Sequence, residues 1–331
     1  MLRRYVKMTA LSLCLAGGAF VPGVSAQIKI QWAKGEASGV PTARHESAAA
    51  VVDGKLYLIG GRGDRPLDIL DIASGKWSTG AKAPVEMNHT QAVVLDKRIY
   101  VIGAFTGKFP QENIVPRIMI YDPATNAWSE GAAMPAGRER GGAGVVVHNG
   151  QIYLVGGNRL GHNSGYVPWL DRFDPKSGSW TALADAPRPR DHFHAAVLDG
   201  KIYAAGGRRS SADIKQPLAL TIGEMDIYDI ASNSWTTAAA PIPTQRAGVS
   251  VMTIGKQIVV MGGESGVQVP AHAEVEAYNP ATGSWTALAP LPVGRHGMQA
   301  VQSGNRIHVL AGSGNRGGGP ELNDHWIMSG F

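Results

Sequence analysis

A motif that recurs about every fifty residues constrains this chain more than any other feature. Each copy contains a pair of small residues, and the pairs lie at Gly60-Gly61, Gly103-Ala104, Gly156-Gly157, Gly206-Gly207, Gly262-Gly263 and Ala311-Gly312. In five copies a tryptophan follows, and seven positions before it lies an aromatic residue or, once, a leucine. Self-similarity at a fixed period of this length indicates a repeat architecture built from one supersecondary unit.

The segments before each tryptophan have the composition of tight turns. They begin with Asp or Asn and end with Gly or Asn, and they span residues 71–75, 122–126, 174–178, 229–233 and 279–283. Asp and Asn open turns by bonding their own backbone, and Gly or Asn accepts the positive φ that closes them. Upstream of each pair, two β-rich runs meet at a hairpin signal such as Asp53-Gly54. Each repeat therefore predicts four antiparallel strands, which is the blade of a propeller.

The two ends of the chain predict how the ring closes. The last repeat reaches a third strand near residues 324–328 and stops without its tryptophan strand. An orphan strand with a tryptophan, Ile28–Trp32, lies near the start instead. We expect this N-terminal strand to complete the sixth blade, because closure removes the open strand edges of a linear array.

The first 26 residues have the pattern of a secretory signal peptide. Arg3, Arg4 and Lys7 precede an apolar stretch from Met8 to Val21, and Val24-Ser25-Ala26 supplies small residues before Gln27. The apolar stretch is short for a retained membrane helix. We expect cleavage after Ala26, a periplasmic or secreted location, and a mature chain of residues 27–331 that forms a single domain without a membrane span.

Composition excludes several classes of partner and scaffold. Three of the 31 basic residues and none of the 26 acidic ones lie in residues 1–26, which leaves the mature chain at +2. That balance is not the basic stripe of a nucleic-acid binder. The one cysteine, Cys14, lies in the expected signal peptide, so the exported chain depends on its core and not on disulfides.

The periodicity over essentially the whole mature chain resembles that of kelch-repeat six-bladed β-propellers of the galactose oxidase/kelch-like superfamily, in the bacterial exported form. The resemblance implies an all-β fold. It leaves function open, since kelch propellers serve as enzymes, ligand-binding modules and protein-interaction platforms. Copper oxidases of this kind need a cysteine crosslinked to tyrosine, which the mature chain lacks.

Alignment on the small-residue pairs picks out a set of arginines. Sixteen residues before the first position of each pair stand Arg44, Met87, Arg140, Arg190, Arg246 and Arg295. Kelch domains that capture acidic peptides carry arginines at these positions, around the channel mouth. The resemblance implies that the five arginines bind an anion, while Met87 leaves the second blade without its cation. Guanidinium groups suit carboxylates in a concave mouth. The alternative is structural, with each arginine bonded to backbone carbonyls at strand ends.

Histidines and one glutamate lie at the same level of the predicted ring. His45, His192 and His296 join the candidate binding set, while His89 and His194 lie nearby. No spacing within one strand brings three of them together, so we expect polar mouth residues and neither a metal site nor a cofactor. Glu264 directly follows the fifth pair and is the candidate acid or base if the protein is an enzyme.

Three long loops follow the pairs of repeats 2, 3 and 4 and carry aromatics beside cations. Together with the arginines they favour a recognition module for an anionic ligand, either a sugar acid or an acidic protein segment. The other interpretation is a sugar-acid isomerase or mutarotase on the same face, because bacterial exported sialic-acid mutarotases resemble this chain in size, signal peptide and repeat number. The sequence leaves catalysis undecided.

Overall fold

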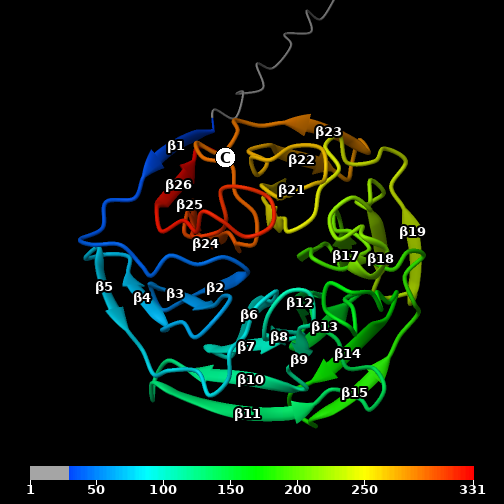
Figure 1. Cartoon of the computed structure of the whole chain (residues 1–331), viewed down its shortest axis with the longest axis horizontal. Coiled ribbons are helices and arrows are strands. Elements are labelled where there is room, and N and C mark those ends of the chain that lie inside the picture. The colour runs from blue at the N-terminus through cyan, green and yellow to red at the C-terminus, as the bar shows by residue number, and fades with distance from the viewer. Residues whose placement is uncertain (1–29) are drawn as a thin grey trace, which may run out of the picture.

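Six four-stranded antiparallel sheets stand around a central axis like the blades of a fan (Figure 1). The computed structural model describes residues 30–331, so the expected signal peptide lies outside the described part. One short 3-10 helix, η1 (Ala212–Ile214), interrupts the strands. Among residues 30–331 no helix is both long and apolar enough to cross a membrane. The all-β six-bladed fold expected from the repeats is confirmed.

Each of blades 1 to 5 is one repeat of the sequence, and blade 6 combines the last repeat with β1. Blade 1 comprises β2 (Ser47–Val52), β3 (Lys55–Gly60), β4 (Asp68–Asp71) and β5 (Lys76–Thr79). Blade 2 comprises β6 (Gln91–Leu95), β7 (Arg98–Ile102), β10 (Arg117–Asp122) and β11 (Ala127–Ala133). Blade 3 comprises β12 (Gly144–His148), β13 (Gln151–Val155), β14 (Leu170–Asp174) and β15 (Ser179–Ala182).

The second half of the ring repeats this arrangement. Blade 4 comprises β16 (Ala195–Leu198), β17 (Lys201–Ala204), β18 (Asp226–Asp229) and β19 (Ser234–Thr237). Blade 5 comprises β20 (Ser250–Ile254), β21 (Gln257–Met261), β22 (Val275–Asn279) and β23 (Ser284–Ala287). Blade 6 comprises β24 (Val301–Ser303), β25 (Arg306–Leu310), β26 (His325–Ser329) and β1 (Gln31–Lys34). A small extra hairpin, β8 (Phe105–Thr106) with β9 (Asn113–Ile114), lies in the long loop of blade 2.

The N-terminal strand completes the last blade. β1 pairs with β26 in antiparallel register, with Trp32 opposite Met328, and the two strands lie side by side in Figure 1 as blue and red arrows. The Trp32 indole donates a hydrogen bond to the Ala289 carbonyl at 3.1 Å, which ties β1 to the segment that leaves blade 5. The pairing that the two chain ends predict is therefore present.

The hairpin turns have the geometry that their composition predicts. The opening side chains accept hydrogen bonds from backbone N–H groups two or three residues on, as Asp122 does from Ala124 at 2.9 Å and Asn279 from Ala281 at 2.9 Å. The closing residues are left-handed, with φ of +68° at Gly75 and +53° at Asn126. Glycine and asparagine tolerate this region best, so the same turn is built in five repeats.

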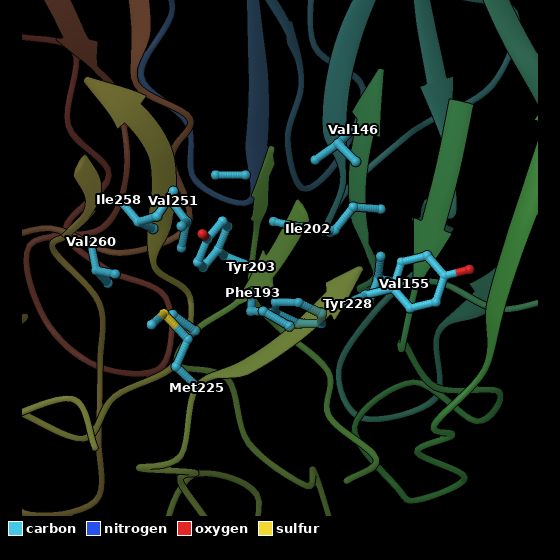
Figure 2. Close-up of a cluster of buried hydrophobic side chains, with 14 of the residues drawn as sticks. Val146, Val155, Phe193, Ile202, Tyr203, Met225, Tyr228, Val251, Ile258 and Val260 are labelled. Carbon is cyan, nitrogen blue, oxygen red and sulfur yellow. The ribbon is translucent and has the colours of Figure 1, made fainter. Parts of the chain in front are cut away.

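The core lies between neighbouring blades. Figure 2 shows Tyr203 and Phe193 of the blade 4 segment flanked by Val146 and Val155 of blade 3 on one side and by Val251 and other residues of blade 5 on the other. The repeat aromatics pair along the third and fourth strands, as Tyr228 and Trp235 do with ring centroids 5.1 Å apart. Tryptophan indoles then bond backbone carbonyls before the blade begins, for example Trp235 to Ala184 at 2.7 Å.

Candidate functional site at the channel mouth

A closed belt of backbone hydrogen bonds defines the mouth. The residue two positions after each aligned arginine position is left-handed, with φ between +52° and +63°; these residues are Glu46, His89, Gly142, His192, Gly248 and Gly297. The last five donate their backbone N–H to the carbonyl of the belt residue in the preceding blade at 2.6 to 3.1 Å. In blade 1 the N–H of Ser47, and not that of Glu46, donates to the Gly297 carbonyl at 3.1 Å and closes the circle. The belt therefore fixes six chain segments around one axis, with their side chains close together.

The five aligned arginines lie inside their blades. Each is at most 1% exposed, and each contacts a carboxylate on or beside the third strand of its own blade. The pairs are Arg44–Asp68, Arg140–Asp171, Arg190–Asp226, Arg246–Glu276 and Arg295–Asp324. Arg140 also donates to the carbonyls of Gly156 at 2.6 Å and Leu154 at 2.9 Å.

This is the structural arrangement that the sequence left open as an alternative. Burial removes the guanidinium groups from water, and the carboxylates and strand carbonyls replace that hydration. An anion at the mouth would have to displace those partners to reach these arginines. Their role as a binding ring is thus a prediction to which the geometry of the mouth adds no support.

Blade 2 shows why Met87 departs from the pattern. Val101 of β7 pairs with Met119, whereas the equivalent residue of β3, Leu58, pairs with Asp68. Blade 2 therefore replaces both partners of the ion pair, and Met87 and Met119 are 1% and 2% exposed. An apolar pair of this size can take the place of a buried ion pair at little cost in stability.

A second set of polar residues surrounds the axis at the mouth. Eight side chains from all six blades form a circle in which every member contacts the next. The circle runs Arg208, Glu264, His296, Glu46, His89, Arg62, Glu112, His162 and back to Arg208. Taken from Arg208–Glu264 onward, the closest distances between successive members are 2.6, 3.5, 3.4, 3.5, 3.4, 2.6, 2.8 and 3.0 Å. We call this set the mouth circle.

The charges of the mouth circle are set by its neighbours. Burial alone would raise the pKa of Glu264, but His296 and Arg208 more than compensate and lower it to about 2, so this carboxylate is ionised at neutral pH. Glu46 behaves alike, and beside its histidine neighbours its pKa falls well below the usual range. Burial lowers the pKa of His296, yet Glu264 and Glu46 outweigh it and raise the pKa above its ordinary value.

The predicted site residues are thus distributed over different roles. Glu264 and His296 belong to the mouth circle, with 3.5 Å between the Glu264 carboxylate and the His296 Nε2. His45 lies outside it and contacts the Glu321 carboxylate at 2.9 Å. His192 lies against the circle, with its ring centroid 4.4 Å from that of His162 and 4.6 Å from that of His89.

Several members of the circle were not expected from the sequence. Arg62 and Arg208 occupy the same repeat position as Glu264, directly after the small-residue pair, so the alignment could have found them. Glu112 and His162 lie in loops without repeat periodicity. Those loops are joined over the mouth: the His162 N–H donates to the Pro110 carbonyl at 3.0 Å, and the Ala212 N–H donates to the His162 carbonyl at 2.9 Å.

A cavity of about 20 Å³ adjoins the circle, which is room for a single water molecule. Its lining includes Glu46, His89, His192 and His194. Pockets that enclose small ligands measure several hundred Å³, so this cavity does not accommodate a sugar.

The chain spans about half the length, or less, of the curated relatives it matches. It is 32% identical over 266 residues to Kelch-like protein terF of Aspergillus terreus (strain NIH 2624 / FGSC A1156), a match that covers 75% of this chain and 56% of that protein. It is 26% identical over 258 residues to Kelch-like protein 25 of Xenopus tropicalis, covering 75% of this chain and 41% of that protein.

The solved structure titled "Structure of YjhT" has the same fold. The TM-score is 0.73 at 17% sequence identity, and the match covers 87% of this chain and 95% of that one. The family model described as the Attractin/LZTR1 beta-propeller matches residues 28–272. With its six blades and its kelch-type repeats, this chain therefore belongs to the Attractin/LZTR1 β-propeller family.

Proposed function

We propose that this propeller is a binding module whose loops at the channel mouth recognise an acidic segment of a partner protein that also carries apolar side chains. The observation that carries the proposal is the surface of the loops between the second and third strands of the blades. Of the seven large apolar side chains exposed among the described residues, five lie on these loops: Phe109, Leu160, Ile214, Val267 and Val269. Apolar side chains gathered on one face are typical of interaction sites.

Charge gives this face its preference for anions. The same loops expose five cations, Lys108, Arg159, Arg209, Lys215 and Arg316, against three acids, Asp64, Asp213 and Glu224. Exposed cations on a rim attract an acidic partner and accelerate its encounter, while apolar contacts supply affinity. The small volume of the axial cavity favours such a surface partner over an enclosed sugar acid.

A defined peptide tests this proposal. We expect a synthetic peptide that alternates Glu with Leu to bind the folded protein in fluorescence anisotropy, and the affinity to fall as salt rises. Arg159→Glu combined with Arg209→Glu should weaken binding about tenfold, because two rim cations become anions. Lys97→Glu, in the β6–β7 turn away from these loops, is the matched control. No binding, or an equal loss in the control, would contradict the proposal.

A catalytic use of the mouth draws on a different observation, the buried contact between Glu264 and His296. A carboxylate beside an imidazole is a pair that can move a proton. On a sugar acid it would act as an isomerase or mutarotase. Exchange NMR on sialic-acid anomers decides this: acceleration that Glu264→Gln abolishes supports catalysis, and a rate equal to that of buffer removes it.

We place this binding module outside the cytoplasm, on the pattern of residues 1–26 alone. The expected outcome of expression with the full sequence in a Gram-negative host is a periplasmic product whose N-terminal sequence begins at Gln27. A product that keeps Met1 would refute the assignment.

A further inference from the structure

We propose that His89, His162 and His192 form a binding site for a divalent transition metal at the centre of the mouth. One ring nitrogen from each of these buried side chains lies within 4.8 Å of those of the other two. The three come from the entrances of blades 2 and 4 and from the long loop of blade 3. Their ring centroids are 4.4 to 5.1 Å apart.

The histidines are held in the orientation that a metal site requires. Each Nδ1 contacts an oxygen: Asn88 Oδ1 at 2.6 Å for His89, Glu112 Oε1 at 2.8 Å for His162, and Asp191 Oδ1 for His192. These oxygens accept, so each Nδ1 carries the proton and each Nε2 keeps its lone pair. Ligating histidines characteristically have their other nitrogen bonded in this way.

His192 gives the most direct sign of a ligand. Its side chain is fully buried, and its Nε2 has no hydrogen-bond partner among residues 30–331. Its partner Asp191 is itself fixed by the N–H of Ser210 at 2.9 Å and by the Ser210 hydroxyl at 2.6 Å. A buried acceptor without a hydrogen-bond partner destabilises the folded protein unless a ligand binds to it.

The backbone points the same way. His89 and His192 have φ of +52° and +54°, whereas the equivalent belt residues of blades 3, 5 and 6 are glycines. A side chain in this region is strained relative to glycine. Two blades therefore keep a histidine where glycine would be more stable, and both histidines face the same cluster.

Two arginines compete with the metal for these lone pairs. Arg208 Nη2 lies 3.0 Å from His162 Nε2, and Arg62 Nη2 lies 3.4 Å from His89 Nε2. Both arginines hold other acceptors, since Arg208 bonds Glu264 at 2.6 Å and Arg62 bonds Glu112 at 2.6 Å. They can give up the histidine contacts without losing these carboxylates, so metal and arginine are alternatives at the same nitrogens.

The donor set selects the class of metal. Three imidazole nitrogens favour Zn²⁺, Co²⁺, Ni²⁺ or Cu²⁺ over Mg²⁺ and Ca²⁺, which prefer oxygen. The cavity of about 20 Å³ borders His89 and His192 and has room for one water-sized fourth ligand. Three histidines and one open position are a known arrangement for Zn²⁺.

Metal titration of the untagged, chelator-treated protein tests the site. We expect calorimetry to show one equivalent of Zn²⁺ bound, with a rise in melting temperature on binding. His192→Gln should weaken binding at least about tenfold, as loss of one ligand does. His148→Gln on β12 is the matched control and should bind as the original protein does. Absence of stoichiometric uptake, or uptake that survives His89→Gln, His162→Gln and His192→Gln alike, overturns the proposal.

A measurement on the unaltered protein guards against variants that fail to fold. X-ray absorption at the zinc edge is expected to show three imidazole ligands, and Co²⁺ in place of Zn²⁺ should give the intense visible bands of a four-coordinate site. A zinc spectrum with an oxygen shell alone would place the ion elsewhere and refute the assignment to these histidines.

Discussion

At the scale of single residues, the five aligned arginines show how the propeller stabilises a buried charge in five of its six blades. Arg246 is fully buried, bonds the carbonyl of Gly262 at 2.6 Å and contacts Glu276 at 2.5 Å. Met87 and Met119 take the place of such a pair in blade 2. The ion pair of blade 5 and the methionine pair of blade 2 indicate that a blade needs two side chains that match each other in this position, and that they need not be charged.

This comparison predicts the outcome of breaking and then replacing a pair. Glu276→Met should destabilise the protein by about 3–5 kcal/mol, because it leaves Arg246 buried without its carboxylate. Adding Arg246→Met should recover most of that loss, since it recreates the arrangement of blade 2. Urea unfolding measures both.

An exposed pair serves as the control for that experiment. Lys256 and Asp199 are 3.1 Å apart at the surface, and Lys256→Met should change stability by less than about 1 kcal/mol. If the double variant in blade 5 is no more stable than Glu276→Met alone, the idea of interchangeable pairs is wrong.

The sequence predicted where these arginines stand but not what they do. Counting from the small-residue pairs found all five positions, because the repeat fixes them just before the innermost strand of each blade. Their burial depends on a carboxylate about thirty residues further along, such as Asp171 for Arg140, and on a side-chain direction that the spacing does not reveal. Residue type alone could not separate an anion-binding arginine from a structural one.

At the scale of elements, hairpins and ring closure follow closely from the sequence, because turn chemistry is local. The Asp or Asn that opens a turn needs only its next three residues, and β1 was identified by the tryptophan of the fourth strand, which the last repeat lacks. The loops between second and third strands could not be placed in this way. His162 and Glu112 lie in such loops, and long-range contacts to Arg208 and Arg62 decide their positions.

Removal of β1 tests the closure. A protein of residues 35–331 loses the pairing with β26 and leaves that strand with an open edge, so its melting temperature should fall sharply relative to that of residues 27–331. Trp32→Ala should cost about 2–3 kcal/mol, less than a fully buried tryptophan, because its indole is half-buried. Calorimetry checks both. An unchanged melting temperature in the deletion variant would disprove the structural role of β1.

Acid sensitivity of blade 6 is a second prediction for an element. His308 of β25 and His325 of β26 stack with Nδ1 and Nε2 2.9 Å apart. Burial lowers the pKa of each to about 4, helped by Arg306 for His308 and by His308 for His325, while Asp324 opposes the shift at His325. In the unfolded chain these two histidines therefore take up protons below pH ~6.5, whereas in the folded blade they stay neutral until pH ~4.

Stability should accordingly be full above pH 6.5 and should fall as the pH drops toward 4, by up to about 3 kcal/mol for each histidine. Urea midpoints at several pH values measure this slope, and His325→Gln should reduce it. His148→Gln, on β12 at the other side of the ring, should leave it unchanged. A slope that is the same in all three proteins would contradict the assignment.

At the scale of the whole molecule, the ring brings together what no single repeat contains. The mouth circle takes members from all six blades, and the three-histidine cluster takes one residue from each of three. Such a site depends on the backbone belt that sets the distance between blades, so the site can form only when the ring is closed. The fold was therefore predictable from the recurrence of one pattern along the chain, whereas the site required six repeats in their final positions.

The pairing of β1 with β26 also affects the order in which the chain folds. Gln31 lies opposite Ser329, so β1 finds its partner only after the chain has been made as far as β26, about 300 residues later. Contacts that join such distant positions form late and slowly. Until then, the unpaired edges of β1 and its neighbours could pair with other chains. Loss of β26 would prevent closure of the ring as much as loss of β1 would.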